Sequence, residues 1–231
     1  MQYLTEEELT QSPIVANCRM NRARGLSGVN SYQKEFGIDF VGMLMDRVEN
    51  GLPLRWLDVC CGEGLALLEA SEQTRELLGK DELVLEGLDL VPFFKAFDAE
   101  RHPHVQLRLV SVQDWVPDVE YDLITCIHGL HYLGDKLGVM AKLVGALKED
   151  GLFFGNLDLA NVREKEGETM EKAVLKEWKE MGWRYDKRKR LLAVGGKTNW
   201  EMKWKYLGAK DDAGPNYTGQ EAVNSYYEAL V

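Results

Sequence analysis

The residues with the clearest chemical potential are two glycines that directly follow a short apolar run containing an acidic residue. Within WLDVCCGEGLALLEA, residues 56–70, Gly62 and Gly64 separate this run from a segment rich in leucine and alanine. Glycine lets a backbone approach a ligand closely, and the helix N-terminus that follows presents unpaired N–H groups and a positive dipole end. We therefore expect a ligand of nucleotide size to bind at this turn.

A second group of reactive side chains occurs in the segment CIHGLHY, residues 126–132. His128 follows an apolar run, and because histidine titrates near neutral pH it is the best candidate for a general base. His131 and Tyr132 are second choices for the same role. A hydrogen-bonded structural histidine is an equally weighted alternative for His128.

Strands that alternate with helices are expected to position these groups. The sequence predicts strands at 56–59, 84–89, 105–110, 123–127 and 152–157. Helices are expected after the glycine turn, around the phenylalanines of 93–97, and from Asp135 to Gly151. This alternation is typical of βαβ units, which form a parallel sheet with helices on both faces and bind ligands at the carboxyl ends of the strands. The candidates at that edge are the Gly62–Gly64 turn, Asp89, Val112, Gln113 and residues 126–128.

Residues 1–54 predict a helical block ahead of the central strand. Thr5 and Glu8 have the spacing of a capping box, so a short acidic helix is expected there. A longer helix is expected from Asn30 or Ser31, with Phe36, Phe40, Leu44 and Val48 at intervals of four along one face. Residues 18–29 between them are typical of a loop. We expect this block to pack across the ligand-bearing edge of the sheet as a lid.

The C-terminal part has a different pattern. It predicts an amphipathic helix over 163–183, a strand over 190–194, and a half-buried antiparallel strand over 200–206, where aromatic residues and Met202 alternate with charged ones. Capping-box spacing at Thr218 and Glu221 predicts a last helix through Tyr226 and Tyr227. Because nothing resembles a linker, residues 1–231 are expected to form one domain, with 55–231 as its core.

Composition excludes several functions. The formal net charge of −10 argues against a nucleic-acid partner, which would require phosphate neutralisation by Lys and Arg. Four cysteines without CxxC spacing and an acidic N-terminus without an apolar signal region favour a reduced cytoplasm. No apolar run is long enough for a membrane span, and no cluster of ligands predicts a metal site. The sequence predicts no particular oligomeric state.

The pattern Asp58-x-Cys60-x-Gly62-x-Gly64 resembles the first motif of the class I S-adenosylmethionine-dependent methyltransferases, with Cys60 in place of the usual first glycine. A dinucleotide-binding fold would instead show GxGxxG. The resemblance covers about residues 55–207. It implies a Rossmann-like α/β fold with a mostly parallel seven-stranded sheet, an antiparallel last strand and helices on both faces. The segments SGVNSYQKEFG (27–37), RWLDVCCGEG (55–64), CIHGLHYLGDKL (126–137) and DDAGPNYTGQ (211–220) also resemble a branch of small bacterial-type methyltransferases associated with natural-product tailoring. This narrower resemblance is less specific.

The same resemblance assigns roles along the cleft. Asp89 would accept both ribose hydroxyls, and the segment from Ser111 to Asp114 would bracket the adenine, with Gln113 or Asp114 holding its amine. The fourth-strand segment would lie beside the methionine part and the acceptor. Apart from the resemblance, Tyr32 and Arg24 of the lid are candidates to line the cofactor, where an aromatic ring near a sulfonium gains cation–π attraction. A packed tyrosine and a solvated arginine are equal alternatives. The residues expected to bind the cofactor are Tyr32, Asp58, Cys60, Gly62, Gly64, Asp89, Leu90, Ser111, Val112, Gln113, Cys126 and Ile127.

The resemblance implies methyl transfer from S-adenosyl-L-methionine, leaving S-adenosyl-L-homocysteine. A small-molecule acceptor methylated at oxygen, on a hydroxyl or a carboxylate, is favoured, and with a carboxylate His128 would only position the acceptor. A peptide carboxyl terminus is an alternative acceptor. A non-catalytic cofactor-binding subunit or sensor is an alternative of another class, and a nicotinamide-dependent oxidoreductase is opposed by the missing GxGxxG.

Overall fold

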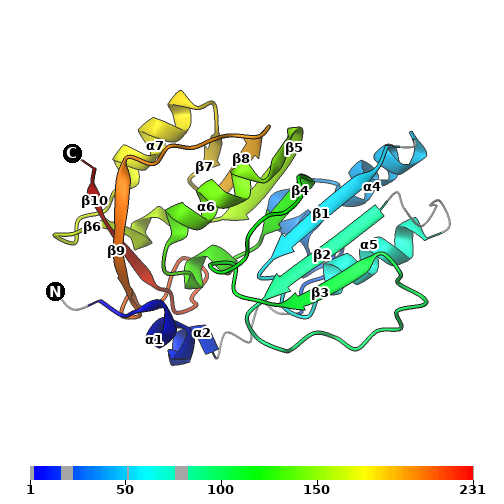
Figure 1. Ribbon diagram of the computed structural model, residues 1–231, viewed down its shortest axis with the longest axis horizontal. Coiled ribbons are helices and arrows are strands. Elements are labelled where there is room, and N and C mark those ends of the chain that lie inside the picture. The colour runs from blue at the N-terminus through cyan, green and yellow to red at the C-terminus, as the bar shows by residue number, and fades with distance from the viewer. Residues whose placement is uncertain (1–2, 17–22, 51, 76–82, 231) are drawn as a thin grey trace.

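The computed structural model describes residues 3–16, 23–50, 52–75 and 83–230. Within them, a seven-stranded sheet has the order β3-β2-β1-β4-β5-β8-β7 (Figure 1). Its strands are β1 (Leu54–Val59), β2 (Leu83–Asp89), β3 (Val105–Leu109), β4 (Tyr121–Cys126), β5 (Leu147–Asn156), β7 (Arg184–Asp186) and β8 (Leu191–Gly195). Strands β1 to β5 are parallel, whereas β8 is antiparallel to both β5 and β7. The predicted mostly parallel sheet, whose last strand in sequence is antiparallel, is therefore confirmed.

The register of the central strands brings their carboxyl ends to one edge. Val59 of β1 lies opposite Leu88 of β2, and Asp58 lies opposite Thr125 of β4. All six residues of β4 are buried, as expected for a parallel strand covered on both faces. The glycine turn after β1, Asp89 at the end of β2 and the loop after β4 consequently meet at the same edge.

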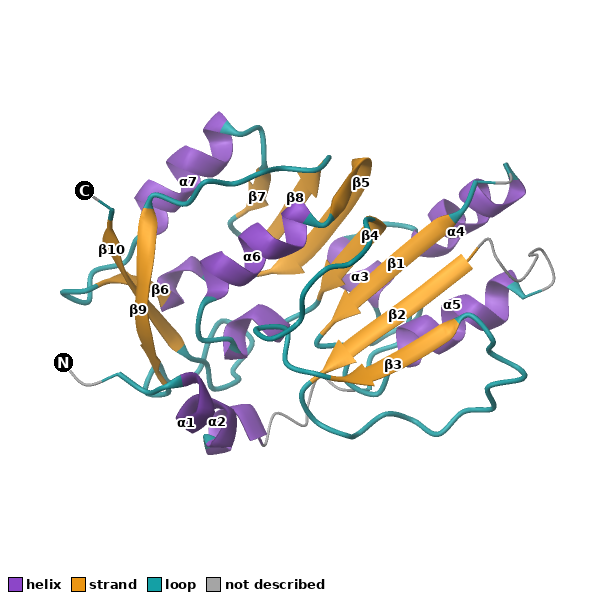
Figure 2. Ribbon diagram, in the orientation of Figure 1, coloured by secondary structure: helices purple, strands orange, loops and turns teal. Residues whose placement is uncertain are grey.

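Helices cover both faces of the sheet (Figure 2). Trp56 packs with α3 (Tyr32–Phe36), α4 (Phe40–Glu49) and α5 (Leu65–Thr74), whereas its neighbour Leu57 belongs to the cluster that contains α6 (Lys136–Gly145) and α7 (Glu171–Glu180). Successive residues of a strand point to opposite faces, so these two clusters fill the two sides of the sheet. The prediction of helices on both faces is confirmed.

The structure also contains a second, three-stranded sheet with the order β6-β10-β9, which the sequence patterns did not predict. It contains β6 (Val162–Glu164), β9 (Trp204–Lys210) and β10 (Asn224–Ala229). The expected C-terminal helix is wrong, because the residues of β10 pair with β6 and β9 instead. Thr218 does not cap a helix: its N–H and hydroxyl both donate to the Asn216 side chain in a turn.

Three other helix predictions need correction. The helix expected from Asp135 to Gly151 ends at Gly145, because the chain enters β5 at Leu147. Residues 91–104 form no helix, and the chain there is tied to the glycine turn by the Lys95 N–H, which donates to the Glu63 carbonyl. The helix expected over 163–183 begins only at Glu171, because residues 162–164 pair as β6. The strand expected over 200–206 begins at Trp204 and belongs to the smaller sheet. In each case a long-range backbone contact replaced the local pattern.

The N-terminal block contains α1 (Glu6–Gln11), with the expected capping box between Thr5 and Glu8, and α2 (Pro13–Ala16). The helix predicted from Ser31 is divided into α3 and α4, because Gly37 adopts a left-handed conformation with φ 71°. Residues 18–22 of the predicted loop lie outside the described residues. Among the helices described, none combines the length and apolarity needed to cross a membrane. That this block acts as a lid over the ligand-bearing edge stays a prediction.

Candidate functional site

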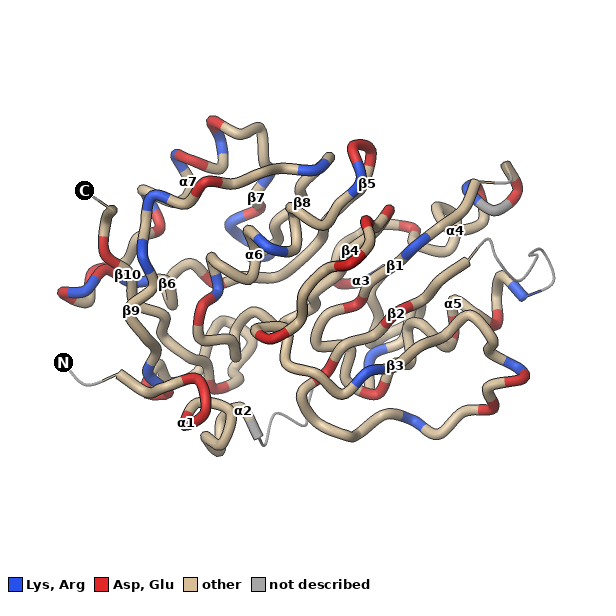
Figure 3. Tube along the Cα trace, in the orientation of Figure 1, with Lys and Arg blue, Asp and Glu red and all other residues tan. Residues whose placement is uncertain are grey.

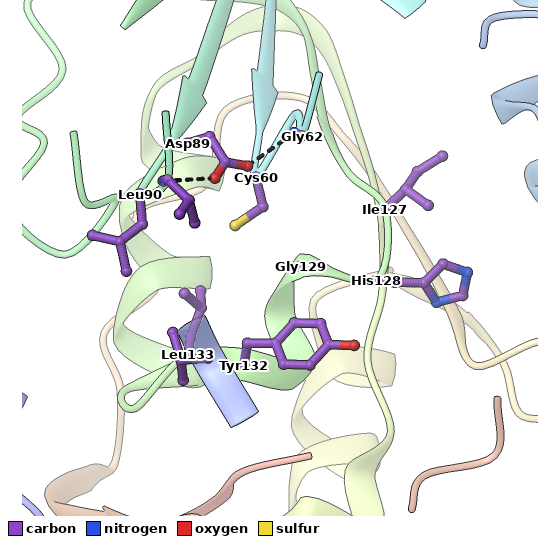
Figure 4. A pocket seen from close by; sticks show the side chains of 11 residues that line it. Cys60, Gly62, Asp89, Leu90, Ile127, His128, Gly129, Tyr132 and Leu133 are labelled. Carbon is purple, nitrogen blue, oxygen red and sulfur yellow. Dashed lines mark hydrogen bonds between the residues drawn. The ribbon is translucent and has the colours of Figure 1, made fainter. Parts of the chain in front are cut away.

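A cleft at the carboxyl edge of the sheet consists of two adjoining hollows of about 600 and 420 Å³, open solvent included. The hollows share Val15, Cys60, Asp89, Leu90, Tyr132 and Leu133. The first hollow continues to Gly62, Val91, Ile127, His128 and Gly129 (Figure 4). The second continues to Glu6, Leu9, Thr10, Leu88, Val110, Ser111, Val112, Gln113 and Gly134.

The glycine turn forms the floor of the cleft. Gly62 and Gly64 have φ of 61° and 73°, and Cys60 also has a positive φ of 58°. This conformation costs a side-chain-bearing residue about 1–2 kcal/mol, which explains why glycine suits the position of Cys60. Gly129 makes room for the Cys60 side chain, because a Cβ atom at Gly129 would collide with it.

Asp89 links the turn after β1 to the end of β2. Its Oδ2 accepts from the Gly62 N–H at 2.9 Å, and its Oδ1 accepts from the Val91 N–H at 3.0 Å. Carboxylate oxygens each accept more than one hydrogen bond, so these contacts orient Asp89 while leaving it able to accept hydroxyl groups of a ligand. Figure 4 shows the carboxylate between Gly62 and Leu90 at the cleft.

Asp58 and Tyr32 lie beneath the cleft rather than along it. Asp58 is fully buried, and its two carboxylate oxygens accept from the hydroxyls of Tyr32 and Thr125, each at 2.6 Å. Burial raises the pKa of Asp58 to about 7, although the two hydroxyl donors oppose the shift. Tyr32 is buried among Phe36, Phe40 and Trp56. Both residues therefore support the turn after β1 from below, and neither Gly64 nor Cys126 lines the two hollows.

Two lysines of α6 hold the walls of the cleft. Lys142 Nζ donates to the carbonyls of Val112, Gln113 and Trp115 at 2.7–3.0 Å, which fixes the segment after β3. Lys136, fully buried, donates to the carbonyls of Leu133 and Val223 and to the Ser225 hydroxyl. Burial lowers the pKa of Lys136 to about 7. These contacts connect β10 and the segment after β3 to the cleft. No local sequence pattern predicts them, because each joins segments far apart in the chain.

His128 lies at the end of the first hollow, after β4. The ring is turned away from Cys60, Asp89 and Leu90 (Figure 4). Its Nε2 lies 3.2 Å from Glu35 Oε1, and its Nδ1 lies 3.3 Å from the Tyr217 hydroxyl. The hydrogen bond from His128 lowers the pKa of Glu35, which favours a carboxylate acceptor and a proton on Nε2. Sequence reasoning missed Glu35 and Tyr217, because they reach His128 from segments far away in the chain.

The two other candidate bases differ in position. Tyr132 lines both hollows, from the 3₁₀ helix η1 (Gly129–Tyr132). His131 is fully buried and lines neither hollow, and within the described structure its ring nitrogens have no hydrogen-bond partner. Burial lowers the pKa of His131 well below its usual value, which keeps the ring neutral. The structure therefore brings Tyr132, but not His131, to the cleft.

The described residues contain no group of three or more His, Cys, Asp and Glu that could hold a metal ion.

A family model described as a methyltransferase domain matches residues 31–211. The chain belongs to this family. Its mostly parallel seven-stranded sheet is the fold that the resemblance to class I S-adenosylmethionine-dependent methyltransferases implied. The resemblance noted in the sequence is thereby confirmed. No curated protein matched the chain.

The solved structures similar to the chain include several methyltransferases. One is an amino pentose methyltransferase from Micromonospora echinaspora, solved with S-adenosylmethionine (23% identity, 53% of this chain, 52% of that chain, TM-score 0.38). A second is the plantazolicin methyltransferase BpumL with S-adenosylhomocysteine (14%, 53%, 46%, TM-score 0.40). A third comes from Thiobacillus denitrificans, also with S-adenosylhomocysteine (15%, 63%, 64%, TM-score 0.39). The chain spans about half the length of the first two.

Proposed function

We propose that the protein transfers a methyl group from S-adenosyl-L-methionine to an oxygen atom of a small-molecule acceptor. The observation that carries this proposal is the continuous cleft that joins Gly62, Asp89 and the segment 111–113 to His128. In this assignment the adenine lies beside Ser111–Gln113, the ribose at Asp89, and the methionine part towards Gly62 and Ile127. The cofactor fits these residues, because Asp89 offers acceptor oxygens to ribose and Gly62 presents no side chain at the floor.

When bound, S-adenosylmethionine supplies an electrophilic methyl group on a positively charged sulfur. The chain's contribution is mainly to hold the acceptor in line with that group, and good orientation of two reactants is worth about 7–11 kcal/mol. Val15, Leu90 and Leu133 give the cleft apolar walls. An apolar surrounding also strengthens the electrostatic interactions made inside it.

For a hydroxyl acceptor, we assign the general base to His128 Nδ1. Because a proton on Nε2 faces the Glu35 carboxylate, Nδ1 is the ring nitrogen that can accept a proton, and in this structure the Tyr217 hydroxyl lies 3.3 Å from it. The acceptor hydroxyl would take the place of Tyr217 at Nδ1 and give up its proton there as its oxygen attacks. Glu35 would then stabilise the protonated ring. A carboxylate acceptor needs no base, and a peptide carboxyl terminus belongs to that case.

A protein that binds the cofactor without transferring its methyl group is the competing function. It draws support from the ring of His128, which already has a partner at each nitrogen. The two functions differ in one measurable property: only a methyltransferase moves the labelled methyl group of the donor onto an acceptor molecule.

The test has two parts. Calorimetry with S-adenosylmethionine and S-adenosylhomocysteine should show binding at sub-millimolar concentration. If neither compound binds, the cofactor assignment is wrong. Incubation with radiolabelled donor and a panel of small phenols, alcohols, carboxylic acids, amines and extract fractions should label a compound at oxygen. Label at nitrogen would refute the acceptor atom, and tight cofactor binding with no label in any fraction would favour the non-catalytic competitor.

A further inference from the structure

The N-terminal helix α1 forms one wall of the second hollow. Glu6, Leu9 and Thr10 of α1 line this hollow together with Ser111–Gln113 from the segment after β3. The helix is anchored by its capping box and by Leu4, whose N–H donates to the Ala209 carbonyl of β9 at 2.9 Å. Figure 1 shows α1 beside the ends of β9 and β10. A segment more than 100 residues away in sequence thus faces the region assigned to adenine.

Glu6 is the unexpected residue of this wall. It is one of three successive glutamates that begin α1, shown red in Figure 3, but it is half-buried whereas Glu7 and Glu8 are exposed. Its Oε1 accepts from the Tyr206 hydroxyl at 2.9 Å, and a Cβ atom at Gly134 would collide with the carboxylate. Burial raises the pKa of Glu6. Burial in this largely apolar hollow disfavours the charged form of Glu6. A hydrogen-bond donor on a ligand would therefore stabilise the carboxylate.

Gln113 lies in the same hollow and offers the opposite kind of group. Its side-chain Nε2 is buried and has no hydrogen-bond partner in the described structure. Its backbone is fixed, because its N–H donates to the Ser111 hydroxyl and its carbonyl accepts from Lys142 Nζ. An unsatisfied buried N–H costs about 1–3 kcal/mol, so a ligand acceptor would stabilise this arrangement. Asp114 is exposed and does not line the hollow.

We propose that Glu6 and Gln113 together recognise the amino edge of adenine. Glu6 accepts a hydrogen bond from the 6-amino group, and Gln113 Nε2 donates one to ring nitrogen N1. A carboxylate acceptor beside an amide donor matches the donor and acceptor that adenine presents side by side on this edge. Leu9, Val15 and Leu90 supply apolar contacts for the base. The proposal rests on the proposed function, and it makes α1 a determinant of nucleoside specificity.

The test compares S-adenosylhomocysteine with S-inosylhomocysteine, which carries a 6-oxo group and a protonated N1. We expect wild-type protein to prefer the adenosyl compound by roughly 10- to 100-fold in Kd, because both hydrogen bonds are lost and the oxo group faces a carboxylate. Glu6→Gln should weaken the adenosyl compound about tenfold and reduce the preference to about threefold or less, because the amide can donate to the oxo group. The glutamine can still accept from Tyr206, so α1 keeps its anchor.

Glu7→Gln is the matched control, because it removes the same charge from an exposed position on the same helix. It should leave both Kd values unchanged. A Gln113→Leu variant should lower the preference without reversing it. If wild type binds S-adenosylhomocysteine but Glu6→Gln keeps the full preference, the assignment of Glu6 is overturned and the proposed function stands. If wild type binds neither compound, the proposed function itself fails.

Discussion

The buried carboxylate of Asp58 should make the stability of the fold depend on pH. Asp58 is fully buried, and its pKa is raised from 3.8 to about 7 by loss of solvation. The folded state therefore binds the proton more tightly than the unfolded chain, so this group's contribution to stability is present at low pH. The contribution falls as the pH rises through the folded value. Between about pH 5 and about pH 8, wild type should lose roughly 3 kcal/mol relative to Asp58→Asn, which cannot ionise.

Urea unfolding of wild type and Asp58→Asn across this pH range measures the effect. The difference between the two proteins isolates the Asp58 carboxyl, because every other titrating group is shared. Asp118→Asn, at an exposed carboxylate, is the matched control and should follow wild type in parallel. A difference that stays constant with pH would refute the reasoning. It would mean that the hydroxyls of Tyr32 and Thr125 keep Asp58 ionised despite its burial.

Three further predictions concern the cleft. Asp89→Ala should weaken S-adenosylhomocysteine binding by about 10- to 100-fold, measured by calorimetry, and an unchanged Kd would refute the ribose assignment. His128→Ala should lower turnover of a hydroxyl acceptor by about 10²- to 10⁴-fold with cofactor affinity retained, and full turnover would exclude His128 as the base. Gly129→Ala should destabilise the fold by about 1–3 kcal/mol in urea unfolding, because its new methyl group meets Cys60. Cys60→Gly should recover part of that loss, and additive effects would contradict the contact.

Local sequence patterns were sufficient to predict the central parallel strands β1, β2 and β4. The apolar run before Gly62, the run ending at Asp89 and the run 123–127 each became a strand in parallel register, because a strand buried on both faces needs a continuous apolar segment. The same kind of reasoning failed at Tyr226 and Tyr227. Their spacing suits a helix as well as a strand, and only pairing with β9 and β6 decided between them.

The sequence by itself determined the class of protein and the floor of its cleft. Asp58, Gly62, Gly64 and Asp89 act within two adjacent strands and their turns, so spacing along the chain carries the information. Tertiary structure alone decided which distant groups complete the site. Glu6 reached the second hollow with α1, and Glu35 and Tyr217 reached His128 from opposite ends of the chain. No local sequence pattern predicts these contacts, because they depend on how the N-terminal block and the smaller sheet pack against the carboxyl edge of the seven-stranded sheet.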